Sequence, residues 1–204
     1  TQKYSTQIYT ENVSHKLIFD RIELGTYLIA AALAGKKVSF LKIKPKIIKT
    51  EIKLLKKMGV KMQVEKNKIT IFESGKLKSV NIKTEPYPGF PTDLQAQVMV
   101  LMLKASGTSK ITEKIFENRF MHVPELRRMG AKIITKKNVA LVSGPTNLSG
   151  AEVMATDLRA SVSLVLAALI AENRTIINRI YHLDRGYENL EKKLKKCNVS
   201  ITRL

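Results

Sequence analysis

One local pattern occurs three times along this chain, and it restricts the fold more than any other feature of the sequence. In each copy an aspartate opens a long, mostly apolar segment: FDRIELGTYLIAAALAG, TDLQAQVMVLMLKASG and TDLRASVSLVLAALIAEN. When the copies are aligned on Asp20, Asp93 and Asp157, the second and third share the spacing of one helix face. The matched positions are Leu94, Val98, Leu101, Met102 and Ala105 with Leu158, Val162, Val165, Leu166 and Leu169. The pattern predicts a threefold repeat of one structural unit.

The sequence downstream of each apolar segment repeats as well. A β-rich stretch comes next (KKVSFLKI, SKITEKIF or RTIINRIY), and then an amphipathic helix that ends in KKMGVK, RRMGAK or KKCNVS. The first two copies continue into predicted hairpins, VKMQVEKNKITIF and AKIITKKNVALV, whereas the third stops at VSITRL, one strand short. We therefore expect β-α-β-α-β-β units at about 17–72, 73–143 and 144–204, which form one domain over 17–204. Residues 1–16 would be an N-terminal extension or the remnant of an interdomain strand.

The two helices of a unit differ in kind. Between Leu158 and Ala171 the one strongly polar side chain is Arg159, in the first turn. A helix that is apolar nearly all round is a buried helix. The second helices, such as IIKTEIKLLKKM, carry one apolar stripe and a basic remainder, so one face of each meets water. We expect an α/β fold of the α+β kind, turned inside out, with three buried helices at the centre and sheets packed around them.

The composition excludes several classes of protein. The longest apolar run, Val162 to Ala171, is too short to span a bilayer, and no export signal precedes the fold, so we expect a cytoplasmic protein without a membrane partner. A single cysteine, Cys197, excludes an internal disulfide and is expected to be a buried or semi-buried thiol at a helix end. The net charge of +19 is typical of nucleic-acid binding, but the basic residues are dispersed and not interleaved with aromatics, which disfavours that partner.

The stretch PYPGFPTDLQAQ, residues 86–97, stiffens the backbone just before Asp93. One interpretation is that Thr92 or Asp93 caps a helix, because both residue types accept hydrogen bonds from free N–H groups at a helix start. The other is that the rigid approach aims the Asp93 carboxylate at a ligand. On these residues alone the cap is the simpler explanation.

Four segments carry a resemblance to a known family: FPTDLQAQ, ITEKIFENRFMHVPELRRMGA, MATDLRAS and RIYHLDRGYE. They closely resemble the bacterial UDP-N-acetylglucosamine enolpyruvyl transferases of peptidoglycan synthesis, and the similarity runs from about Leu17 to the C-terminus. The shikimate-pathway enolpyruvyl transferases share the fold but resemble these segments much less. The resemblance implies six units in two domains, with UDP-N-acetylglucosamine and phosphoenolpyruvate bound between them and no cofactor. This chain would be the C-terminal domain, and its partner would be the missing N-terminal-side domain.

The resemblance also implies roles for single residues. Asp93 would contact the sugar 3-hydroxyl and take its proton, and Thr92 would be among the substrate-binding residues beside it. Thr92 could cap the helix at the same time. Arg185 would hold phosphoenolpyruvate, whose carboxylate and phosphate suit a planar guanidinium. Asp157 would take part in proton transfer, and Arg159 would face the cleft.

Two further positions are implied by the same resemblance. Arg119 would lie at the cleft rim and take part in closure, and the backbone of Ile115 would contact the nucleotide. The residues themselves leave simpler alternatives open: a helix cap for Asp157, a structural ion pair for Arg119 and a solvated loop position for Arg185. Cys197 does not match the family's reactive cysteine, which belongs to the other domain.

No metal site is expected, because His15, His122 and His182 show no ligand spacing and no cysteine could join them. His122 and His182 would orient loops. Two functions from different classes stay open: an enolpyruvyl transferase of which this chain supplies one cleft wall, or a remnant or ligand-binding domain that keeps the fold without the reaction. Because closure of two domains assembles such a site, we expect no turnover from this chain alone.

Overall fold

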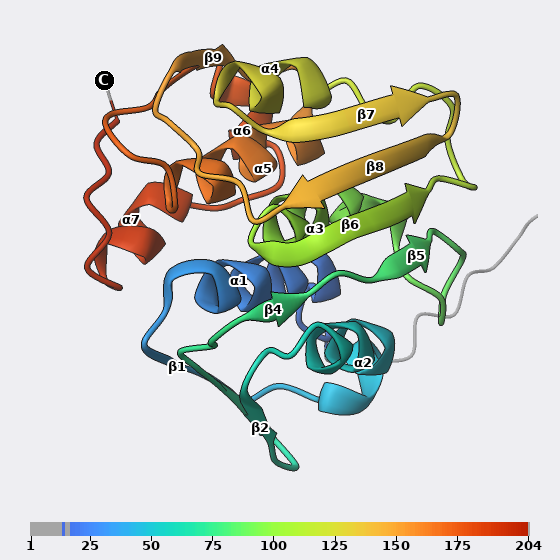
Figure 1. The fold of residues 1–204 in the computed structure, drawn as a ribbon. Coiled ribbons are helices and arrows are strands. Elements are labelled where there is room, and N and C mark those ends of the chain that lie inside the picture. Colours follow the sequence, from blue (N-terminus) through green and yellow to red (C-terminus); the bar gives the residue numbers. More distant parts are fainter. Residues whose placement is uncertain (1–13, 15–16, 204) are drawn as a thin grey trace, which may run out of the picture.

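The apolar segment of each repeat forms a helix, and the three helices pack together at the centre of the molecule. The computed structural model describes Ser14 and residues 17–203 (Figure 1). The central helices are α1 (Arg21–Ala34), α3 (Gln95–Met102) and α5 (Leu158–Ala168). Helix α3 contacts both α1 and α5, and all of its side chains are buried. The predicted inside-out arrangement is therefore confirmed.

The first unit packs a small sheet and an amphipathic helix against α1. Its further elements are β1 (Lys37–Leu41), a 3₁₀ helix (Pro45–Ile48), α2 (Lys49–Lys57), β2 (Met62–Val64) and β3 (Lys68–Phe72). Strand β3 lies between β1 and β2 and is antiparallel to both. Because α2 turns its lysines outward and its leucines inward, it behaves as the half-exposed helix that its sequence predicts.

The second unit repeats this strand arrangement. Its elements are β4 (Leu77–Lys78), β5 (Asn81–Lys83), α3, β6 (Ala105–Thr112), α4 (Val123–Arg128), β7 (Lys132–Lys136) and β8 (Val139–Gly144). Strand β8 lies between β6 and β7, as β3 lies between β1 and β2, and the sheet packs over α3 (Figure 1). Strands β4 and β5 run parallel to β6 at its other edge.

One position of the helix alignment is wrong. Ala105 was expected on the apolar face of the second helix, but α3 ends at Met102 and Ala105 begins β6. The backbone from Ala105 onward pairs with β4 and β8, so its hydrogen bonds go to the sheet and the helix cannot continue.

The third unit is shorter and has no hairpin. Its elements are β9 (Glu152–Met154), α5, β10 (Ile176–Asn178), α6 (Tyr181–Asp184) and α7 (Leu190–Lys195), and β9 pairs with β10 in parallel. The strand expected at VSITRL is wrong, because residues 199–203 form no strand. A strand without a partner leaves its backbone groups unpaired, and here Val199 and Ile201 instead pack on the small core around α7. The limits of the three units stay a prediction.

Cys197 is exposed, so the expectation of a buried or semi-buried thiol is wrong. In the repeat alignment Cys197 corresponds to Met58 and Met129, and both methionines are fully buried. Those residues lie between the second helix of their unit and the hairpin after it. Among the described residues no hairpin follows α7, so nothing covers the end of this helix and the thiol is exposed.

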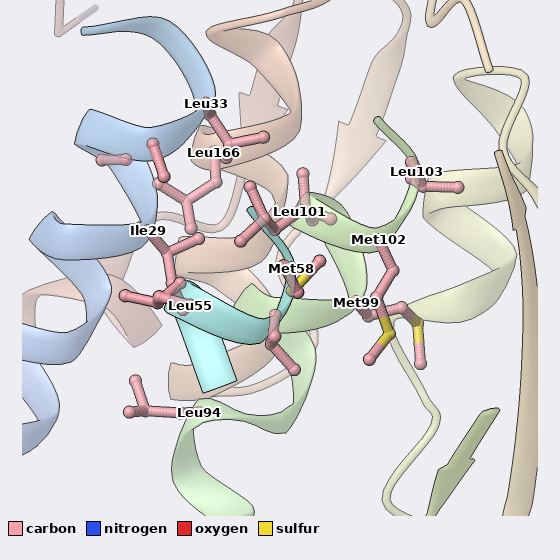
Figure 2. Packing of buried hydrophobic residues seen from close by; sticks show 14 of the residues in the cluster. Ile29, Leu33, Leu55, Met58, Leu94, Met99, Leu101, Met102, Leu103 and Leu166 are labelled. Carbon is pink, nitrogen blue, oxygen red and sulfur yellow. The ribbon is translucent and has the colours of Figure 1, made fainter. Parts of the chain in front are cut away.

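One hydrophobic core joins the three units. Figure 2 shows side chains of α1, α2, α3 and α5 converging, among them Ile29, Leu55, Leu101 and Leu166. A second, smaller core fills the third unit and consists of Val162, Val165, Leu183, Tyr187, Leu190 and Leu194. Side chains buried to this extent each contribute about 1.5–3 kcal/mol to stability, so the cores fix the relative positions of the helix starts.

Candidate active site

Asp93 does not cap a helix, although the two aspartates aligned with it do. Asp20 Oδ1 accepts hydrogen bonds from the N–H groups of Ile22 and Glu23 at 2.7 and 3.1 Å. Asp157 caps α5 in the same way. In the second unit a 3₁₀ helix, Thr92–Leu94, precedes α3 and no side chain caps it. Its extra turn leaves the Asp93 carboxylate free for other contacts.

The proline-rich approach to Asp93 is held by the first unit. Thr50 Oγ1 donates a hydrogen bond to the carbonyl of Pro88 at 2.6 Å, and the Arg21 guanidinium lies 4.8 Å from the centroid of the Tyr87 ring. On the other side of Asp93, the Leu94 side chain packs where Gly25 of α1 has no side chain, because a Cβ there would lie 2.4 Å from Leu94 Cδ1. The backbone around Asp93 is thus fixed from both sides.

The freed carboxylate faces two arginines. Arg119 Nη2 donates to Asp93 Oδ1 at 2.8 Å, and Arg159 Nη2 donates to Asp93 Oδ2 at 3.4 Å. The side chains are 36% (Asp93), 26% (Arg119) and 19% (Arg159) exposed, so the cluster is open to solvent on one side. Three of the predicted site residues, from two units, are therefore in direct contact. A carboxylate between two guanidinium groups can accept a proton from a bound hydroxyl while the cations hold an anionic ligand.

Thr92 does not cap the helix, contrary to expectation. Its hydroxyl donates instead to Oε2 of Glu113 at 2.9 Å, and Thr84 donates to Oε1 of the same carboxylate at 2.7 Å. The N–H groups of Ile115 and Phe116 also donate to Oε1, at 2.9 and 3.2 Å. Glu113, 2% exposed, therefore ties the turn that carries Asp93 to the loop that carries Ile115.

Sequence reasoning missed Glu113. Two of its hydrogen-bond donors, the hydroxyls of Thr84 and Thr92, come from other segments, so no local pattern marks the residue. The one available signal is an acidic residue inside the predicted β-rich stretch SKITEKIF, in a segment that carried the family resemblance. Because the Ile115 N–H is already bound to Glu113, a nucleotide contact made by this backbone would use its carbonyl group. The Ile115 side chain itself is 36% exposed.

Arg185 lies at the same end of the central helices as Asp93. It follows α6 and is exposed, and its side chain makes no hydrogen bond or ion pair to another residue within 17–203. The next residue, Gly186, packs against Leu158 at the start of α5, because a Cβ there would lie 2.8 Å from the leucine methyl groups. The Tyr187 hydroxyl lies 2.9 Å from the hydroxyl of Thr26 in α1. The turn is thereby anchored beside the helix starts.

His122 lies behind this cluster. It is 2% exposed, and burial lowers its pKa to about 4. The nearby charges have smaller effects: Asp157 raises the pKa and Arg119 lowers it. Its Nε2 has no hydrogen-bond partner among the described residues. A neutral, buried imidazole at the start of α4 packs as part of the scaffold, and it carries no charge at neutral pH.

Other kinds of site are not present in the part of the chain that the structure describes. Within it, no group of His, Cys, Asp and Glu side chains could hold a metal ion, and no helix is long and apolar enough to cross a membrane. A hollow of about 340 Å³ lies at the opposite ends of the central helices, lined by residues that include Lys104, Leu148 and Glu172. None of the predicted site residues lines it.

Comparison with known proteins places this geometry in a family. A family model described as EPSP synthase (3-phosphoshikimate 1-carboxyvinyltransferase) matches residues 3–194. The chain belongs to the EPSP synthase family. Within the family, it is 59% identical over 194 residues to a UDP-N-acetylglucosamine 1-carboxyvinyltransferase of Pelagibacter ubique and 54% identical over 190 residues to one of Glaesserella parasuis. The resemblance inferred from the sequence is confirmed.

Solved structures of EPSP synthase family members agree. The enolpyruvyl transferase NikO from Streptomyces tendae matches 88% of this chain and 43% of its own, with a TM-score of 0.82 and 33% identity. EPSP synthase from Acinetobacter baumannii, at 17% identity and a TM-score of 0.58, shares the fold. The alignment with the Pelagibacter relative covers 95% of this chain but only 46% of the relative. The chain therefore spans about half the length of these proteins.

Proposed function

We propose that this chain supplies one of the two cleft walls of an enzyme that transfers the enolpyruvyl group of phosphoenolpyruvate to the 3-hydroxyl of UDP-N-acetylglucosamine. The observation that carries the proposal is the Asp93 carboxylate held between the guanidinium groups of Arg119 and Arg159. Relatives more than 50% identical bear the name of this activity, which supports the substrate pair. The reaction would make a peptidoglycan precursor in the cytoplasm and so contribute to cell shape and division.

In the proposed reaction Asp93 acts as the general base. It takes the proton of the sugar 3-hydroxyl as the oxygen bonds to the central carbon of phosphoenolpyruvate, while the methylene carbon gains a proton. Loss of that added proton and of phosphate then restores the carbon–carbon double bond. Asp157 is the second group proposed for proton transfer. Its Oδ1 is taken by the helix cap, so Oδ2 would do this work.

The arginines would hold the anionic groups. Arg185, exposed beside the helix starts, is proposed to bind phosphoenolpyruvate, and Arg119 to close over it from the rim. Because both Asp93 oxygens already accept hydrogen bonds from arginines, a bound sugar hydroxyl must share or displace one of them. An incoming phosphate competes for the same guanidinium groups and would release the carboxylate for proton transfer. The Ile115 backbone and Thr92 would support nucleotide binding, with Thr92 acting through Glu113.

The test mixes this chain with the N-terminal-side half of a relative and measures phosphate release from both substrates. We expect turnover from the mixture, no turnover from this chain alone, and a loss of at least ~100-fold for Asp93→Ala. Asp20→Ala is the matched control, because it removes an aligned aspartate that only caps a helix. If the folded wild-type mixture does not turn over, the alternative of a remnant or ligand-binding domain replaces this proposal.

A further inference from the structure

A buried polar cluster joins the three units directly beneath the Asp93 site. Its members are Thr26 of α1, Gln97 of α3 and Tyr187, which follows α6. The hydroxyls of Thr26 and Tyr187 are 2.9 Å apart, and Gln97 Nε2 lies 3.1 Å from the first and 3.3 Å from the second. All three residues are at most 1% exposed. Polar groups buried this deeply in an apolar core are costly unless they are paired, so the cluster tolerates few arrangements.

The cluster contacts the site at two points. Gln97 Nε2 also donates to the backbone carbonyl of Asp93 at 2.9 Å, so the amide holds the turn that carries the carboxylate. On the other side, Tyr187 packs in the small core with Val162 and Leu158 of α5, the helix whose first turn carries Arg159. Burial raises the pKa of Tyr187, whereas its hydrogen bond with Thr26 and the nearby Arg159 charge lower it. Tyr187 is thus linked through Gln97 to the Asp93 backbone and through α5 to Arg159.

The same residue fixes the turn that carries Arg185. Tyr187 lies two residues after Arg185, and the Tyr187 N–H donates to the carbonyl of Leu183 in α6 at 3.1 Å. Between them, Gly186 is pressed against Leu158 and leaves no room for a side chain. Tyr187 lies in the small core and its hydroxyl lies in the polar cluster, so the residue anchors the turn that carries Arg185.

We propose that Tyr187 is a positioning residue. Its buried hydroxyl, paired with Thr26 and Gln97, keeps the start of α5 with Arg159, and the turn with Arg185, in register with Asp93 across the three units. The expected effect on turnover rests on the proposed function. The expected change in the environment of Arg159 does not depend on it. Reactive groups displaced by about an ångström lose much of their rate, so loss of a single oxygen atom should be measurable.

The experiment compares Tyr187→Phe with Tyr181→Phe. Both substitutions remove one hydroxyl, but Tyr181 is 58% exposed and outside the cluster. In the 204-residue chain, arginine side-chain NMR reports the Nε–H signal of Arg159, assigned with Arg159→Lys. We expect this signal to shift and broaden in Tyr187→Phe. It should stay unchanged in Tyr181→Phe, and so should the signal of Arg127, whose Nε donates to the Ile133 carbonyl at 2.8 Å.

A second readout is turnover of the mixture with the complementary half. We expect kcat per folded enzyme to fall ~10-fold or more in Tyr187→Phe, with the pH profile unchanged. Thr26→Val removes the partner hydroxyl and should produce a smaller loss, and the two effects should not add in the double variant. Thr26→Val also replaces Tyr187→Phe as the test if the latter fails to fold.

The outcomes separate the two proposals. An unchanged Arg159 signal together with wild-type kcat in folded Tyr187→Phe overturns the positioning role. A changed signal in a chain whose wild-type mixture has no enolpyruvyl transfer supports the positioning role and overturns the proposed function. A lower melting temperature with wild-type signal and kcat means that Tyr187 acts only in stability, and this also overturns the inference.

Discussion

Asp93 and Arg159 face each other across the boundary between two repeat units, with Oδ2 and Nη2 3.4 Å apart. In the repeat alignment Arg159 lies two positions after the place of Asp93: Asp93 precedes α3, and Arg159 lies in the first turn of α5. Partly exposed ion pairs contribute only about 0–1 kcal/mol, so this contact does little for stability. It keeps the Asp93 carboxylate and the Arg159 guanidinium together in an ion pair that a charged ligand can separate.

The three aligned aspartates should therefore differ in what their removal does. We expect Asp20→Ala and Asp157→Ala each to lower the free energy of unfolding by ~1 kcal/mol, because each loses a helix cap. Asp93→Asn should stay within ~0.5 kcal/mol of wild type, since no cap is lost and the amide oxygen still accepts from arginine. Urea unfolding of the three variants measures this. A loss for Asp93→Asn as large as for the cap variants would contradict the assignment.

Glu113 should be important for stability although it carries no predicted catalytic role. Glu113→Ala leaves the hydroxyls of Thr84 and Thr92 and two backbone N–H groups without their acceptor, so we expect a loss of ~2–4 kcal/mol. Glu113→Gln keeps one acceptor oxygen and should lose less. Chemical denaturation measures both, and the exposed Glu117→Ala serves as the control. A Glu113→Ala variant as stable as that control would show that the hydrogen bonds are not formed.

Gly25 should tolerate no methyl group. Gly→Ala in a helix normally stabilises by about 0.5–1 kcal/mol, but here the new Cβ would lie 2.4 Å from Leu94 Cδ1. We expect Gly25→Ala to destabilise by ~1–3 kcal/mol through overpacking. Gly75→Ala is the control, because nothing lies within 4 Å of its Cβ position. In a Leu94→Ala background the penalty at Gly25 should shrink, and calorimetry that finds no such coupling would refute the contact.

His122 should make the protein less stable at mildly acidic pH. Its pKa is lowered from 6.5 to about 4 in the folded chain, so the unfolded chain takes up the proton first as the pH falls. Stability is therefore complete above about pH 6.5 and is lost toward pH 4, by roughly 2 kcal/mol at pH 5. Urea unfolding at pH 7.5 and pH 5 measures the difference. His122→Asn should lack this component, whereas His182→Asn should keep it.

The features that could be predicted from the sequence depend on short-range patterns. The apolar spacing after Asp157 identified a buried helix, and α5 is one. The hairpins VKMQVEKNKITIF and AKIITKKNVALV form as expected, because a strand–turn–strand pattern carries its own partner. The family segments placed Asp93, Arg119 and Arg159 on one candidate site, and the structure brings these three side chains into contact.

The predictions that were wrong concern contacts that a residue makes with other segments, which its local pattern does not contain. Among the described residues, 199–203 have no strand to pair with and no hairpin covers Cys197. Thr92 looked like a cap, but Glu113 takes its hydroxyl.

By itself, the sequence determined the three buried helices, the family and the set of residue types available for chemistry, because helix periodicity and motif identity are properties of neighbouring residues. Tertiary structure alone decided which of the three aligned aspartates keeps its carboxylate out of a helix cap. Asp20 and Asp157 cap their helices, while Asp93 meets arginines at positions 119 and 159. A carboxylate pairs with whatever donors the packed backbone brings within about 3 Å, and residues far apart in the chain come that close only once the core has formed.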